Sequence, residues 1–208
     1  VCTAGPVFVD PTRAFGAGVH ASTGTDLVVT GGVTSGSDNP AVIARNASTS
    51  SGGGLYLQGE IPANLDGVHF VDNTAVDGGG LWVGGASNAS IVEVGPCNAS
   101  TLAFEEYCIE FRGNDAQRGG AAYVDGGTLT MTEVAMIDNF TTTGVASPGA
   151  QAIQAVGAAD VNLNSVMLLG HDSSPSGDGT ITGADTADID ITAMTSANAV
   201  AAYFDLDG

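Results

Sequence analysis

The chain has 208 residues and a formal net charge of -19, because 23 carboxylates face only four arginines and there is no lysine. This acidic field repels nucleic acid and anionic lipid, and no apolar run approaches the roughly 20 residues of a membrane helix, so we expect neither nucleic-acid binding nor membrane insertion. A hydrophobic content of 43% argues against a disordered chain.

Short β-strands are predicted along the whole chain. They alternate apolar and polar residues or are rich in β-branched residues, and Gly, Asn, Asp and Ser separate them. One short helical turn is expected within AFEEYCIEF (103–111). In chain order the predicted strands are GPVFVDP (5–11), LYL (55–57), LWV (81–83), LTMTEV (129–134), VNLNSVML (161–168), TIT (180–182), DIDIT (188–192) and the apolar start of AVAAYFDLDG (199–208).

Two short phrases recur in these strands and turns. One begins with glycines and has an aromatic residue fifth: GGGLYL (52–57), GGGLWV (78–83) and GGAAYV (119–124). The other is an apolar residue, two spacers and Asn: IARN (43–46), FVDN (70–73), FRGN (111–114) and MIDN (136–139). Each glycine phrase begins five or six residues after an Asn, and the next Asn phrase begins 17, 18 or 33 residues later. The repeating unit is therefore about 25 residues long, and one copy carries an insertion.

Short strands that repeat at this interval predict an all-β fold, a single parallel β-solenoid domain over 1–208 with about eight coils. The alternative, an antiparallel sandwich, gives no reason for two phrases to repeat in register. The insertion is placed at about 86–108, and Cys97 and Cys108 within it are predicted to form a disulfide, the alternative being two buried free thiols. A disulfide indicates a location outside the cytosol, and Cys2 is then left to pair with another segment or chain. The N-terminal Val1 is expected to be a processed end or the start of an excised piece.

The pairing of GGA/GGG phrases with F-x-x-N phrases resembles the polymorphic outer-membrane-protein repeat of bacterial surface adhesins and autotransporter passengers. The resemblance covers Ile43 to Val124 and fades towards Asn139. It implies a right-handed, single-stranded parallel β-helix with an adhesin-type role.

Stacked coils place equivalent residues in columns. Asn tolerates the left-handed backbone region and its amide can bond the next Asn, so the asparagines are predicted to form a turn column, with the apolar members of the same phrases in an interior column. By alternation the three aromatic residues point outward, as an exposed face for sugar rings or another protein; the alternative is ordinary pairing between coils under the insertion. The predicted columns are Asn46, Asn73, Asn114 and Asn139; Ile43, Phe70, Phe111 and Met136; and Tyr56, Trp82 and Tyr123.

Candidates for catalysis and ligand binding lie in the same columns. Asp72 and Asp138, with Arg112 in the intervening phrase, are the candidates for polysaccharide cleavage, but Asp is common in turns for backbone reasons. No catalytic residue and no cofactor is therefore predicted. Diffuse Ca²⁺ binding by acidic turns stays open, since Asp205 and Asp207 begin a D-x-D-G pattern without its remaining ligands. Of the N-x-S/T sequons, Asn88 and Asn98 are the better glycosylation acceptors, because Asn46 and Asn139 belong to the turn column.

These features favour a non-enzymatic, extracellular or cell-surface module of structural or adhesin type. Its expected partners are a cell-surface glycan or protein, or further copies of itself stacked head to tail into a filament, because a solenoid leaves strand edges at both ends. The alternative function is a polysaccharide-binding or polysaccharide-cleaving β-helix protein.

Overall fold

The computed structural model of the chain describes residues 18–24, 26–34, 37–92, 109–141, 152–164, 166–169, 181–183, 187–192, 194–197 and 204–205. Its described residues contain strands and turns and no helix. Of the segment expected to hold a helical turn, 109–111 belong to a strand, and 103–108 lie outside the described residues.

Three large sheets make up the fold. The first sheet contains, in spatial order, β1 (Val19–Ser22), β6 (Leu55–Gln58), β9 (Leu81–Gly84), β13 (Ala122–Asp125), β17 (Ile153–Val156), β20 (Ile181–Gly183) and β23 (Phe204–Asp205). The second contains β2 (Leu27–Thr30), β7 (Pro62–Asp66), β10 (Asn88–Val92), β14 (Thr128–Thr132), β18 (Asp160–Asn164) and β21 (Asp188–Ile191). The third contains β5 (Ala41–Ala44), β8 (Val68–Val71), β11 (Ile109–Arg112), β15 (Val134–Ile137), β19 (Val166–Leu169) and β22 (Met194–Ala197).

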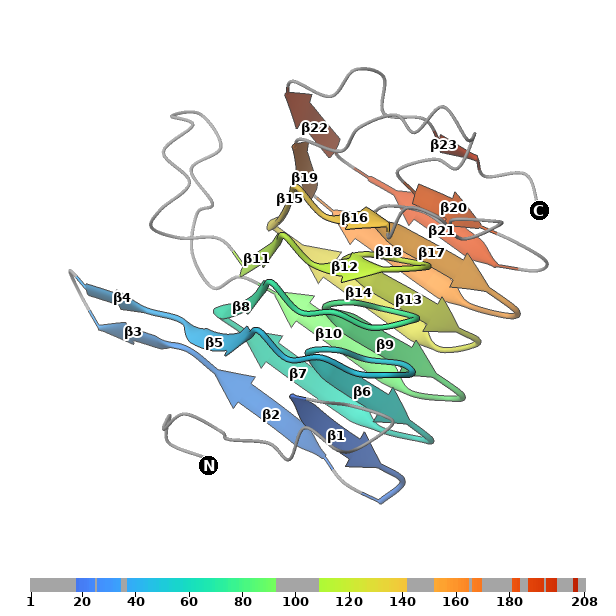
Figure 1. Cartoon of the computed structure of the whole chain (residues 1–208), viewed down its shortest axis with the longest axis horizontal. Coiled ribbons are helices and arrows are strands. Elements are labelled where there is room, and N and C mark those ends of the chain that lie inside the picture. The colour runs from blue at the N-terminus through green and yellow to red at the C-terminus, as the bar shows by residue number, and fades with distance from the viewer. Residues whose placement is uncertain are drawn as a thin grey trace.

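The chain visits the three sheets in turn, and we call one such set of three strands a rung (Figure 1). The described residues pass through six rungs, and β23 begins a seventh. All strand pairs within the three sheets are parallel. The antiparallel sandwich is therefore wrong, and the stacked parallel strands are compatible with the predicted β-solenoid. The number of about eight coils stays a prediction, because residues 1–17 lie outside the described part of the chain.

Two pairs of short strands stand beside the large sheets. The strands β12 (Asp115–Ala116) and β16 (Phe140–Thr141) pair in parallel between consecutive rungs. The strands β3 (Gly32–Thr34) and β4 (Ser37–Asn39) form an antiparallel hairpin between β2 and β5, which the repeat did not predict. Turn residues in TSGSDN are the local hint of it in the sequence.

The strand β10 occupies 88–92, which the sequence assigned to the inserted loop. Its residues Ala89 and Ile91 point inward and are fully buried, so this rung keeps the regular pattern as far as Val92. The alternation is weak in the sequence here, because the strand begins with NAS, in which the small Ala89 is the only apolar residue. The rest of the predicted insertion, with Cys97 and Cys108, lies outside the described residues, as does Cys2.

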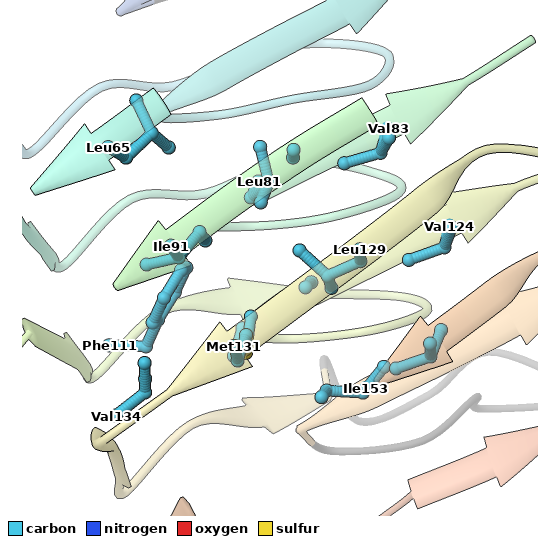
Figure 2. Packing of buried hydrophobic residues seen from close by; sticks show 14 of the residues in the cluster. Leu65, Leu81, Val83, Ile91, Phe111, Val124, Leu129, Met131, Val134 and Ile153 are labelled. Atoms are coloured by element: carbon cyan, nitrogen blue, oxygen red, sulfur yellow. The ribbon is translucent and has the colours of Figure 1, made fainter. Parts of the chain in front are cut away.

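The core lies between the three sheets and consists of columns of like residues. Leu65, Ile91 and Met131 follow one another in register from β7 to β10 to β14 (Figure 2). Each is at most 1% exposed. Burying such a side chain contributes about 1.5–3 kcal/mol, so columns of this kind supply the main driving force for stacking.

The predicted interior column is one of these. Ile43 pairs with Phe70, Phe70 with Phe111, and Phe111 with Met136. The two phenyl rings stack with centroids 4.6 Å apart and planes 12° apart. Ile43, on the first rung, is only partly buried, whereas the other three are fully buried.

The glycine phrases supply the turn that enters the first sheet. Gly78 has a φ of 65°, and its equivalents Gly52 and Gly119 have φ of 67° and 62°, a region that L side chains rarely adopt. The next glycine is required for a different reason, which is the lack of space for a side chain. A Cβ on Gly79 would lie 2.6 Å from the carbonyl oxygens of both Asp115 and Gly120, so only glycine lets adjacent rungs approach here.

Candidate functional site

Four asparagines form a continuous hydrogen-bonded ladder at the turn after the third sheet. In Asn73 both the backbone N–H and Nδ2 donate to Oδ1 of Asn114, at 3.1 and 3.0 Å, and Nδ2 also donates to the carbonyl of Ile43 at 2.8 Å. Asn46 donates in the same way to Asn73, and Asn114 to Asn139. Asn73, Asn114 and Asn139 are at most 1% exposed. The ladder thus forms the polar border of the core at this turn.

The left-handed conformation that the sequence assigned to these asparagines belongs to the residue before each of them. Arg45, Asp72, Gly113 and Asp138 have φ of 57°, 52°, 62° and 49°. The asparagines are not among the residues with positive φ. The physical reason is that the left-handed residue turns the chain so that the following side chain points into the core, where its amide group is used between rungs. The strain, about 1–2 kcal/mol for a residue with a Cβ, falls on a neighbour.

The aromatic residues on the outer surface of the first sheet stack in register from β6 to β9 to β13. Tyr56 and Trp82 lie with ring centroids 4.4 Å apart and planes 12° apart, and His20 meets Tyr56 edge-on at 5.0 Å. Tyr56, Trp82 and Tyr123 are only 4%, 8% and 5% exposed and form a cluster separate from the main core. The expectation of an exposed row of rings is therefore wrong. Tyr56 and Trp82 pack face to face across neighbouring rungs, and Arg118 lies over the ring of Tyr123, which leaves little of these rings for a ligand.

A polar column lies beside these rings. Ser51, Asp77 and Arg118 each stand five residues before one of the aromatic residues, and they follow one another from rung to rung. The guanidinium of Arg118 lies 4.9 Å from the ring centroid of Tyr123. The glycine turn between the two positions brings them together. Sequence reasoning missed this column, although the residue before each glycine phrase is polar in all three copies.

An ion pair with two hydrogen bonds joins two rungs of that column. Arg118 donates from Nε and Nη2 to the two carboxylate oxygens of Asp77, at 2.7 and 2.9 Å. This hydrogen-bonded pairing raises the pKa of Arg118, against an opposing effect of burial. Burial, with a smaller contribution from the charge of Asp125, raises the pKa of Tyr56. The Asp77–Arg118 pair therefore holds two neighbouring rungs together and holds Arg118 against the ring of Tyr123.

A second polar group lies on the outer surface of the third sheet. The carboxylate of Glu110 is almost buried and pairs with Nε of Arg112 on its own strand. Its other oxygen lies 3.7 Å from Nδ1 of His69, which is its register partner on β8. Glu110 thus links two rungs, like the Asp77–Arg118 pair. No repeat signal marks it in the sequence, because the equivalent position on β15 is Ala135.

The candidates for polysaccharide cleavage do not form one column. Arg112 aligns with Val71 and Ile137, whereas Asp72 and Asp138 align with Gly113, one residue later. Asp72 lies on the surface, with an oxygen 3.8 Å from Nε of Arg45. The two aspartates are separated by the Gly113 rung, about 9.6 Å along the stack at two strand spacings. Their shared feature is the left-handed turn.

The remaining predicted sites are only partly described. Asn88 is exposed on the outer surface of the second sheet. Asn98 and Asp207 lie outside the described residues, and Asp205 is placed only as part of β23. Among the residues that the structure describes, no three His, Cys, Asp or Glu side chains gather in a way that would hold a metal ion.

The described part of the chain also contains no helix that is long and apolar enough to cross a membrane. No family model, no curated protein and no solved structure matches this chain.

Proposed function

We propose that this chain is a non-enzymatic structural module of adhesin type, exposed on the outside of a cell, and that it is a right-handed single-stranded parallel β-helix of about eight coils. The proposal on handedness is supported by the parallel strands of each sheet, because crossover connections between parallel strands are right-handed in about 98% of cases. The resemblance of the glycine and Asn phrases to the polymorphic outer-membrane-protein repeat supports the proposed location and role.

One observation carries the proposal: the buried amide, aromatic and charged side chains make their contacts with equivalent residues of the neighbouring rungs. The Asn ladder, the Phe70–Phe111 stack and the Asp77–Arg118 pair each join residues that are 25 to 41 positions apart in sequence. Such contacts make stability the sum of repeated neighbour interfaces and produce a stiff rod. A stiff rod whose polar side chains bond to neighbouring rungs of the same chain suits a spacer, or an element that displays another domain.

Three measurements test this function. Antibodies raised against the chain are expected to label intact, non-permeabilised cells of its source, and beads coated with the chain are expected to adhere to cells above beads coated with an unrelated acidic protein. The chain is also expected to release no unsaturated sugars from polyuronates in Ca²⁺ buffer. Turnover that Arg112→Ala or Asp72→Asn abolishes would instead establish the enzymatic alternative.

A polysaccharide-binding role is the second candidate, and the outer surface of the second sheet favours it. Its central column runs through Asn64, Ser90, Thr130 and Asn162, which follow one another in register. These amides and hydroxyls recur about every 4.8 Å and present donors and acceptors to an extended glycan. Pull-down with insoluble cellulose or chitin tests the role: Thr130→Arg is expected to lower retention, and Asp125→Arg on the first sheet is the matched control.

A further inference from the structure

The outer surface of the second sheet is a face of short polar side chains, which we call the second-sheet face. Three columns of outward residues make it up, and all of these residues are exposed or half-exposed. The middle column consists of Asn64, Ser90, Thr130, Asn162 and Asp190. The column on one side of it consists of Pro62, Asn88, Thr128, Asp160 and Asp188. On the other side lie Asp66, Thr132 and Asn164.

The charges of this face are all negative. Its strands contain no Arg, Lys or His, whereas they carry the carboxylates of Asp66, Asp160, Asp188 and Asp190. The arginines of the described residues lie on the third sheet or in the turns that follow it, where each is close to a carboxylate of its own: Arg45 to Asp72, Arg112 to Glu110 and Arg118 to Asp77. The field of the second-sheet face therefore attracts cations.

Two of these carboxylates oppose each other directly. Asp160 and Asp188 are register partners on neighbouring strands, which lie about 4.8 Å apart, and both are exposed. Like charges in this position destabilise a sheet. Asp160 accepts a hydrogen bond from Nδ2 of Asn162 at 2.8 Å, but on the next rung the place of Asn162 is taken by Asp190. A cationic group bound beside these carboxylates would offset their repulsion.

The arrangement suits single charges along a polymer better than a metal ion. Among the described residues no three His, Cys, Asp or Glu side chains gather closely enough to hold a metal, and the carboxylates of this face are spread over several rungs. A basic peptide would pair through its backbone with the edge of a sheet, whereas this face offers side chains only. Its strands also contain no aromatic ring on which a neutral sugar could pack.

We propose that the second-sheet face binds a cationic polysaccharide, a polymer of amino sugars with free amines. Its hydroxyl groups bond to the amides and hydroxyls of the middle column, and its ammonium groups pair with Asp160, Asp188 and Asp66. The inference rests on the polysaccharide-binding role given above as the second candidate function, and it names the class of glycan. Exposed ion pairs are individually weak, but several on one polymer are expected to lower its dissociation constant about tenfold relative to the acetylated polymer.

Retention of the full chain on chitosan beads, at a mildly acidic pH at which the amines are protonated, tests the class of ligand. The matched control is the same batch of beads after N-acetylation, which removes the charge and keeps the sugar backbone. We expect about tenfold tighter binding to the untreated beads in about 0.1 M NaCl, and most of this difference to be lost at about 1 M, where the Debye length is about 3 Å. Equal binding to both beads overturns the cationic class and leaves the polysaccharide role standing. Binding to neither of them, nor to cellulose, overturns that role as well.

A pair of double variants tests whether this face, and not the overall acidity of the chain, makes the contact. Asp160→Asn with Asp188→Asn is expected to weaken binding to chitosan about tenfold. Asp125→Asn with Asp138→Asn removes the same two charges from exposed positions outside the face and is expected to bind like the natural chain. Far-ultraviolet circular dichroism checks that both are folded. Equal weakening in the two variants, or none in the first, overturns the proposal.

Discussion

Nδ2 of Asn114 donates at 2.9 Å both to Oδ1 of Asn139 on the next rung and to the carbonyl of Phe70 on the previous one. One buried side chain therefore ties three rungs together. Its own Oδ1 receives the backbone N–H and Nδ2 of Asn73, so the amide group uses its donors and its acceptor at the same time. A ladder of this kind is fully satisfied in the interior, where the loss of one member leaves buried polar atoms unpaired.

Replacing Asn114 by Ala is expected to lower the free energy of unfolding by about 2–5 kcal/mol, because the backbone N–H and Nδ2 of Asn73, the carbonyl of Phe70 and Oδ1 of Asn139 each lose a hydrogen bond inside the core. Urea denaturation followed by circular dichroism measures the loss. Asn64→Ala, at an exposed position of the second sheet, is the matched control and is expected to change stability by at most about 0.5 kcal/mol. Equal losses in the two variants would show that the ladder does not stabilise the stack.

Substitutions at two glycines separate lack of space from backbone strain. Gly79→Ala is expected to cost about 3 kcal/mol, the upper end for overpacking, because the new Cβ meets carbonyl oxygens that cannot move without parting the rungs. Gly126 has a φ of 70° but the nearest atom to a Cβ is 3.8 Å away, so Gly126→Ala is expected to cost about 1–2 kcal/mol from strain alone.

The second substitution at each site decides between the causes. Asn tolerates the left-handed region, so Gly126→Asn is expected to be less destabilising than Gly126→Ala, whereas Gly79→Asn is expected to be at least as destabilising as Gly79→Ala. Thermal unfolding of the four variants measures the order. A milder effect of Asn at position 79 would contradict the close approach of the rungs.

Repetition explains which parts of this fold were predictable. The interior column and the rung-to-rung contacts of the Asn phrase follow from spacing alone, because a stacked repeat places equal phrases above one another. The burial of Tyr56, Trp82 and Tyr123 could not be predicted in this way, since alternation gives the direction of a side chain but not what covers it. The hairpin β3–β4 and the Glu110 pairing occur once, and a feature that occurs once leaves no periodic signal.

The left-handed residue of the Asn turn shows a different limit. Residue preference pointed to Asn for this conformation, but the amide group is worth more inside the core, where it satisfies neighbours, than at a surface turn. Tertiary context therefore moved the positive φ to Arg45, Asp72 and Asp138, which have weaker or equal intrinsic tolerance of it. Local propensity decided that a left-handed turn forms here, and hydrogen bonding between rungs decided which residue adopts it.

Trp82 is the single tryptophan of the chain and reports on the aromatic column. Because it is 8% exposed and stacked on Tyr56, its fluorescence is expected to be poorly quenched by acrylamide. Asp77→Asn is expected to increase the quenching and to lower stability by about 0.5–1 kcal/mol, since it removes a partly exposed ion pair beside the rings. Asp66→Asn, on the second sheet, is the control. Quenching of the natural chain at the rate of free tryptophan would show that the column is open.

The raised pKa of Tyr56 makes stability fall at alkaline pH. Burial, reinforced by the charge of Asp125, disfavours the phenolate in the folded chain, so the folded pKa lies above the unfolded value of about 10. The contribution of the neutral phenol to stability is fully present below the unfolded pKa and is lost as pH rises through the folded pKa. We therefore expect the melting temperature to decline above about pH 10, and Tyr56→Phe to decline less steeply. Melting curves between about pH 8 and pH 11 measure both. A parallel decline in the two proteins would place the alkaline transition elsewhere, because a phenyl ring at this position has no proton to lose.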